Sequence, residues 1–157
     1  MSRRVKRRLR VTTGSVFFDV IPLLAIPMVF YNVVVFSGIA GPSDHVAAWM
    51  IAPAISVPMF SGSVLDLSVS DIILFLAMPL MFFEIIKSAR TDSLSVLNHT
   101  ISTFTLVIAI VEFVAVKGFS TAVFALLAVM QLVDVIAGFT VTIAAARRDL
   151  GGATVVG

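Results

Sequence analysis

The chain has 157 residues, of which 59% are hydrophobic and 13% are charged. Soluble domains contain about 45–50% apolar and about 25% charged residues, so this composition excludes an ordinary soluble domain and indicates a membrane protein. The length suits one domain. The absence of cysteine excludes disulfides, thiolate metal ligands and cysteine nucleophiles.

Basic residues are distributed unevenly along the chain. Lys and Arg in excess mark the cytoplasmic side of a membrane protein. Only Lys117 falls in a segment that must face the other side. We therefore expect both termini in the cytoplasm of a bacterial inner membrane, with the basic N-terminus near anionic lipid headgroups and no nucleic-acid partner. The remaining basic residues precede the first apolar stretch or follow the second and fourth: Arg3, Arg4, Lys6, Arg7, Arg8, Arg10, Lys87, Arg90, Arg147 and Arg148.

The first expected membrane-crossing helix covers about residues 15–39, after a basic cytoplasmic segment at residues 1–14. Its apolar stretch is too long for a cleaved signal peptide, so we expect the chain to retain it. Pro22 and Pro27 lie inside it and predict a bend, because proline removes a helical hydrogen bond.

An outer loop is expected at residues 40–69. Its apolar segment, residues 46–60, contains Pro53 and Pro58 and is too short to cross a hydrocarbon core of about 30 Å. We expect this segment at the outer surface, flat or as a short helix that breaks near Pro53. The side chains expected to contact a partner there are Trp49, Met50 and Ile55.

Three further helices are expected at about residues 70–88, 93–116 and 120–146, followed by a cytoplasmic tail at residues 147–157. The connections after the second and third helices are short, so consecutive helices run antiparallel. The sequence thus predicts an all-α membrane protein, a four-helix transmembrane bundle made of two antiparallel hairpins.

Acidic residues within apolar helices are the main candidates for function, because burying a charge in the membrane costs about 2.5–3.5 kcal/mol on insertion scales. Asp19, Glu84 and Glu112 lie near helix ends. We expect each of these three to pair with a nearby basic residue; for Glu84 this is Lys87, and for Glu112 it is Lys117.

Asp134 is different, because it lies near the middle of its helix without a basic residue within three turns. Polar residues recur at helical spacing on one face of each of the last two helices, and these faces should meet. We expect Asp134 between them, against Ser102 or Thr105 and neutral at pH 7. Three interpretations stay open: an interhelical hydrogen-bonded zipper, a proton or cation site, or a contact with a partner subunit. The candidate polar site comprises Asp134, Gln131, Ser102, Thr105 and Glu112.

Neither a catalytic constellation nor a cofactor motif is evident in the sequence. His45 and His99 are expected on opposite sides of the membrane, so they cannot share a metal ion, although either alone could ligate a pigment or haem. We therefore expect a non-enzymatic protein, an accessory, assembly or scaffold subunit of a larger membrane complex or a self-associating bundle. The alternative is an oligomeric proton- or cation-linked small transporter or channel that uses Asp134.

Overall fold

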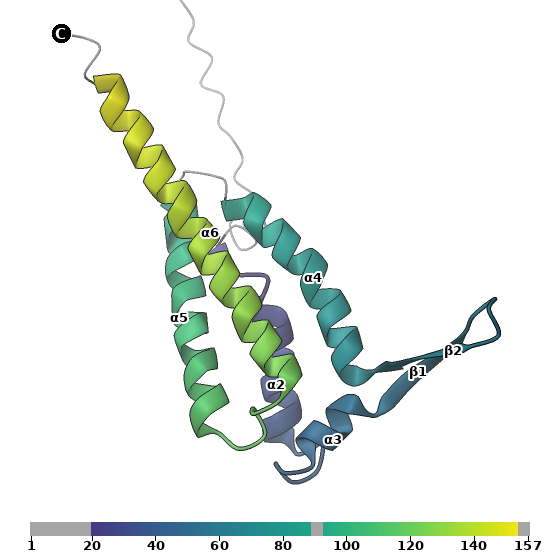
Figure 1. Ribbon diagram of the computed structural model, residues 1–157. Helices are drawn as coiled ribbons and strands as arrows, with labels where there is room; N and C mark the ends of the chain where they lie inside the picture. The colour runs from purple at the N-terminus through teal and green to yellow at the C-terminus, as the bar shows by residue number, and fades with distance from the viewer. Residues whose placement is uncertain (1–19, 89–92, 154–157) are drawn as a thin grey trace, which may run out of the picture.

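The structure is a computed structural model that describes residues 20–88 and 93–153, with side chains described for residues 20–88 and 94–147. It is mostly helical (Figure 1). The elements in chain order are α2 (Ala25–Ser37), α3 (Val46–Ile51), β1 (Pro53–Pro58), β2 (Val64–Ser68), α4 (Val69–Ser88), α5 (Ser93–Ala115) and α6 (Ala122–Ala153).

The four longer helices lie side by side, and α6 is central to their packing. It contacts α4 and α5 extensively and also touches α2, whereas α4 makes few contacts with α2 or α5. Helices α5 and α6 form a hairpin as expected, but α2 and α4 do not pack as a second one. Helix α3, the β-hairpin and the α5–α6 turn lie at one end of the bundle, and the α6 C-terminus extends from the other (Figure 1).

Helices α4, α5 and α6 are long and apolar enough to cross a membrane; the qualifying stretches are Val69–Ser88, Leu94–Ala115 and Ala122–Arg147. Large apolar side chains such as Phe82, Phe104 and Phe139 point outward from them. A water-soluble protein would not expose such a continuous apolar surface. This pattern indicates a membrane protein and confirms that the chain is mainly helical, with long apolar helices, as predicted.

The expected continuous first helix is wrong in detail, although residues 15–19 of it lie outside the described residues. Residues 21–24 are not helical, so the chain breaks at Pro22 rather than bending through it. Pro27 lies in the first turn of α2, where a missing N–H costs little. Helix α2 has 13 residues. At 1.5 Å per residue it spans about 20 Å, less than a hydrocarbon core of about 30 Å.

The outer segment contains strands that the all-α prediction missed. Strands β1 and β2 form an antiparallel hairpin in which Ile55 pairs with Leu67 and Val57 with Leu65. Pro53 and Pro58 stand at the two ends of β1. They fit there because an edge strand tolerates proline, which cannot donate a hydrogen bond to a neighbour.

Different sequence signals set the start of α4 and the end of α6. Ser68 caps α4: its hydroxyl accepts the N–H of Asp71 at 3.2 Å, while the Asp71 carboxylate accepts the Ser68 N–H at 2.9 Å. This reciprocal pair is a capping box. At the other end of the chain, α6 continues to Ala153, so the expected helix end near residue 146 is wrong. No proline follows to stop it, and the residues at 144–147 are strong helix formers.

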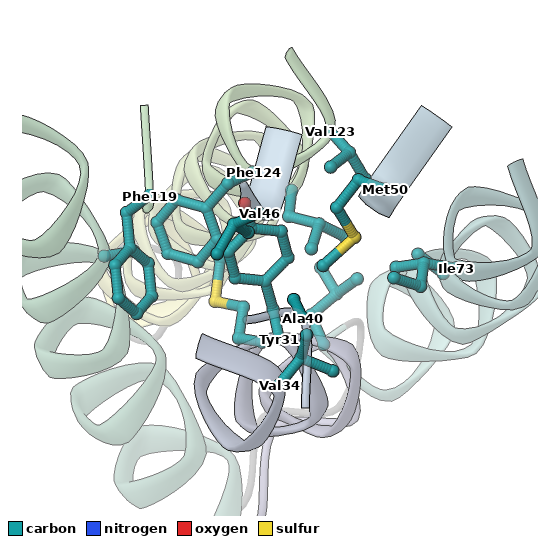
Figure 2. Packing of buried hydrophobic residues seen from close by; sticks show 14 residues of the cluster. Tyr31, Val34, Ala40, Val46, Met50, Ile73, Phe119, Val123 and Phe124 are labelled. Carbon is teal, nitrogen blue, oxygen red and sulfur yellow. The ribbon is translucent and has the colours of Figure 1, made fainter. Parts of the chain in front are cut away.

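The apolar core lies towards the end that carries α3. Tyr31 of α2 contacts Phe119 and Phe124, with ring centroids 5.4 and 4.8 Å away (Figure 2). The Tyr31 hydroxyl donates to the Gly118 carbonyl at 2.9 Å and lies 2.6 Å from the Thr121 hydroxyl. This residue therefore fixes α2 to the α5–α6 turn.

Candidate functional site

A cluster of buried polar side chains occupies the space between α4, α5 and α6. Asn98 and Ser102 lie one turn apart on α5, and Gln131 and Asp134 lie one turn apart on α6, so each pair shares a helix face. Helix α4 contributes Glu84 from its last turns. All five side chains are at most 1% exposed. We call Glu84, Asn98, Ser102, Gln131 and Asp134 the polar cluster.

Asp134 lies at the α5–α6 contact and is 0% exposed. Its Oδ2 accepts a hydrogen bond from Gln131 Nε2 at 3.2 Å. The same amide nitrogen donates to the backbone carbonyl of Ser102 at 3.4 Å, and the Ser102 side chain faces the Asp134 carboxyl. Gln131 thus links the Asp134 carboxyl to the backbone of the neighbouring helix.

Glu84 connects the cluster to the break in the first helix. Its carboxylate accepts the Leu23 N–H at 2.8 Å and the Asn98 Nδ2–H at 2.7 Å, and lies 3.0 Å from Lys87 Nζ. Lys87 Nζ donates to the Ile21 carbonyl at 2.8 Å. The expected Glu84–Lys87 pair is therefore present, and it supplies partners for backbone groups on both sides of Pro22. In a membrane such groups must be satisfied inside the protein.

His99 lies beside the cluster, one turn before Ser102, and is 8% exposed. Its Nε2 is 3.2 Å from the Ser95 hydroxyl. The His99 ring packs directly against Gly138 of α6: a Cβ at that glycine would lie 2.3 Å from His99 Nδ1. Small residues allow membrane helices to approach closely in this way. The sequence predicts only that His99 and His45 lie on opposite sides of the membrane, and it does not predict this contact.

Five buried side-chain atoms here have no hydrogen-bond partner within the described part of the chain. Buried polar atoms in native proteins are almost always hydrogen-bonded, so a local group of exceptions calls for a physical explanation. Four of these atoms are oxygens, and all five lie on adjoining turns of α5 and α6. They are Asn98 Oδ1, His99 Nδ1, Ser102 Oγ, Gln131 Oε1 and Asp134 Oδ1.

Two of the five predicted polar-site residues lie elsewhere. Thr105 donates to the Ile101 carbonyl of its own helix at 2.9 Å. Glu112 accepts from Asn32 of α2 at 3.1 Å. The expected Glu112–Lys117 pair is not formed among the described residues, because Glu112 turns towards α2. Thr105, Glu112 and Asn32 instead line a groove between α2 and α5.

The three residues predicted to contact a partner differ in their exposure. Met50 is 1% exposed and belongs to the apolar core, so its assignment to a partner surface is wrong. Trp49 is half-buried and packs against the same core. Ile55 is 51% exposed on β1 and keeps the predicted accessibility. Helix α3 faces inward because its apolar side contacts the start of α4 and the α2–α6 core.

The polar cluster offers hydrogen bonding, charge and coordination by oxygen. Ser95 and His99 form a pair, but His99 Nδ1 has no orienting partner among the described residues, as an activated nucleophile would need. His45 is exposed beside Asp44, far along the chain from His99. Within residues 20–88 and 94–147, no three His, Asp or Glu side chains gather as a metal site.

Comparisons with protein-family models, curated proteins and solved structures found no match to the chain.

Proposed function

We propose that the chain crosses the bacterial inner membrane four times, with both termini in the cytoplasm. It serves there as an accessory, assembly or scaffold subunit of a larger membrane complex or as a self-associating bundle. Lys87 and Arg147 lie at the end of the bundle opposite to the α5–α6 turn, which holds Lys117. With the basic N-terminus, this distribution favours an orientation in which α3 and the β-hairpin face outward.

The observation that carries the subunit function is the β-hairpin. All six residues of β1 are exposed, and the hairpin projects away from the helices (Figure 1). Ile55 and Val57 on β1 and Phe60 at the turn present apolar side chains to the surroundings. A lone two-stranded hairpin is only marginally stable in water. A protein that covers this apolar surface, or pairs with a free strand edge, would stabilise it.

The base of the hairpin is held firmly in place. Val46 and Met50 of α3 are buried in the core, immediately before β1. At the other side, β2 runs directly into the capped start of α4 at Ser68. An element that is fixed at both ends loses less conformational entropy when it binds, which favours a role in stable assembly.

Native mass spectrometry of the tagged protein, purified in mild detergent, tests this function. The double variant Ile55→Asp/Val57→Asp places charge on the exposed face of β1. The control variant Ser61→Asp/Ser63→Asp places equal charge in the turn, where the two exposed hydroxyls hydrogen-bond to each other. We expect wild type and control to retain a stoichiometric foreign subunit or a defined homo-oligomer, and the β1 variant to be inserted normally but to lose it.

A monomeric wild-type protein would contradict the proposed function. Normal assembly of the Ile55→Asp/Val57→Asp variant would show that the hairpin does not carry the contact.

A further inference from the structure

We propose that the polar cluster binds a small monovalent cation of the size of Na⁺ between α5 and α6. Its oxygen ligands are contributed by Asp134, Gln131, Ser102 and Asn98. This binding site is independent of the subunit function proposed above, because it lies inside the bundle and uses no residue of the hairpin.

The oxygen atoms of these four side chains are the first support for the site. Asn98 Oδ1, Ser102 Oγ, Gln131 Oε1 and Asp134 Oδ1 are all buried without a regular hydrogen bond among the described residues, although the Ser102 hydroxyl lies close enough to the Asp134 carboxyl to interact with it. Hydroxyl, amide and carboxylate oxygens are the ligands that hard cations prefer. The amide nitrogens of Gln131 and Asn98 donate to carboxylates, which leaves their oxygens available. The cluster therefore has the ligand chemistry of a cation site.

The charge of the cluster selects a monovalent ion. Charged groups that face Asp134 are Glu84 and Lys87 on α4, with His99 of α5 as a further titratable neighbour. Glu84 and Lys87 neutralise each other in an ion pair at 3.0 Å. Asp134 has no ion-pair partner within 4.0 Å among the described residues. One bound monovalent cation would make the buried site neutral, whereas a divalent ion would leave a net positive charge in the membrane.

A proton on Asp134 would also remove its charge, but it explains less of the geometry. A protonated carboxyl gains one O–H donor, and the Ser102 hydroxyl supplies one more. A single cation can be coordinated by several oxygens at the same time. Four unpartnered oxygens on adjoining helical turns therefore favour coordination by a cation over protonation alone.

A mainly apolar groove adjoins the site on the surface of α5 and α6. It has a volume of about 310 Å³, and its polar lining comes from His99, Thr100, Thr103 and Thr142. His99 belongs to both the groove and the flank of the cluster. The His99 ring therefore separates the groove from the buried oxygens.

Thermal unfolding of the purified full-length protein tests the site. The probe is NaCl compared with the chloride of the bulky cation N-methyl-D-glucamine, at equal ionic strength and one mildly alkaline pH. A ligand present at about 100 times its Kd stabilises the folded state measurably. We expect NaCl to raise the Tm of the wild type by several degrees, and the Asp134→Asn variant to lose this increase.

Glu112→Gln is the matched control, because it also replaces a carboxylate of the α5–α6 helical hairpin by an amide. Glu112 lies outside the cluster, where it accepts a hydrogen bond from Asn32. This variant should keep the full sodium-dependent increase. Should Asp134→Asn fail to fold, Ser102→Ala and Gln131→Ala provide a second test. Each should raise the NaCl concentration needed for half of the Tm increase by at least threefold.

Equal Tm values in the two salts for the wild type would overturn the proposal and leave a proton-bonded cluster. A sodium-dependent increase that persists in Asp134→Asn would overturn it as well, since the ion would then bind elsewhere. Neither outcome bears on assembly through the hairpin.

Discussion

Gly138 shows how a single residue sets the distance between α5 and α6. A Cβ at this position would lie 2.3 Å from Nδ1 and 2.5 Å from Cε1 of His99. The ring cannot keep its place if a methyl group is added, because real Cβ contacts are much longer. The glycine therefore decides where His99 lies and how closely α5 approaches α6.

We expect Gly138→Ala to destabilise the folded protein by about 1–3 kcal/mol through overpacking. In a His99→Ala background the same substitution should cost much less, since the ring that it meets is gone. Unfolding in mixed detergent micelles would give the four free energies of this double-mutant cycle. Additive effects of the two substitutions would contradict the contact.

Helical periodicity of the polar residues predicted part of the site. The polar spacing on the last two helices placed Asp134, Gln131 and Ser102 on facing sides, and these three lie together. It could not separate Glu112 from them, because the partner that turns Glu112 away is Asn32, 80 positions earlier. Met50 was misassigned for the same reason: its burial depends on α2, α4 and α6 rather than on its own short helix.

Among the elements, the break before α2 depends most on distant residues. Proline at position 22 removes a backbone donor, but whether the helix bends or breaks is decided by what satisfies the freed groups. Here Glu84 and Lys87 bond to Leu23 and Ile21, which are 61 and 66 positions away. A sequence pattern predicts a proline distortion but cannot supply partners at that separation.

We expect Glu84→Gln to cost about 3–5 kcal/mol, because it removes the charge of Glu84 from its largely buried ion pair with Lys87. The Lys87 side chain is 13% exposed. Glu112→Gln is the control and should cost about 1 kcal/mol, since it weakens one hydrogen bond. Unfolding free energies in mixed micelles would compare them. Similar costs for the two variants would mean that the Glu84–Lys87 pair does not hold the break.

The helix ends and the hairpin differ in how well the sequence predicts them. The expected helices at residues 70–88 and 93–116 lie close to α4 and α5, because long apolar stretches are bounded by capping and polar residues. The hairpin was missed because residues 46–60 read as one apolar segment. Its strand alternation appears only when Ile55 and Val57 are paired with Leu67 and Leu65.

The molecule as a whole is apolar outside and polar in part of its interior. Phe, Ile, Val and Leu side chains cover the outer faces of the helices, while Glu84, Asn98, Gln131 and Asp134 are buried. Lipid can surround the apolar side chains, whereas the buried polar side chains need hydrogen-bond partners inside the protein. Composition alone predicted the membrane environment. The division of the interior into an apolar end and a polar cluster required the structure.

The outward position of the hairpin and the inward position of both termini depend on the proposed orientation in the membrane. The chain has no cysteine, so single cysteines can be introduced without background. We expect Ser61→Cys at the hairpin turn to react with an impermeant thiol reagent in intact cells. Ser2→Cys and Thr154→Cys should react only after the membrane is opened, and Phe104→Cys on the outer face of α5 should stay unreactive in both states. Labelling of either terminus in intact cells, or protection of Ser61→Cys there, would contradict four crossings with both termini in the cytoplasm.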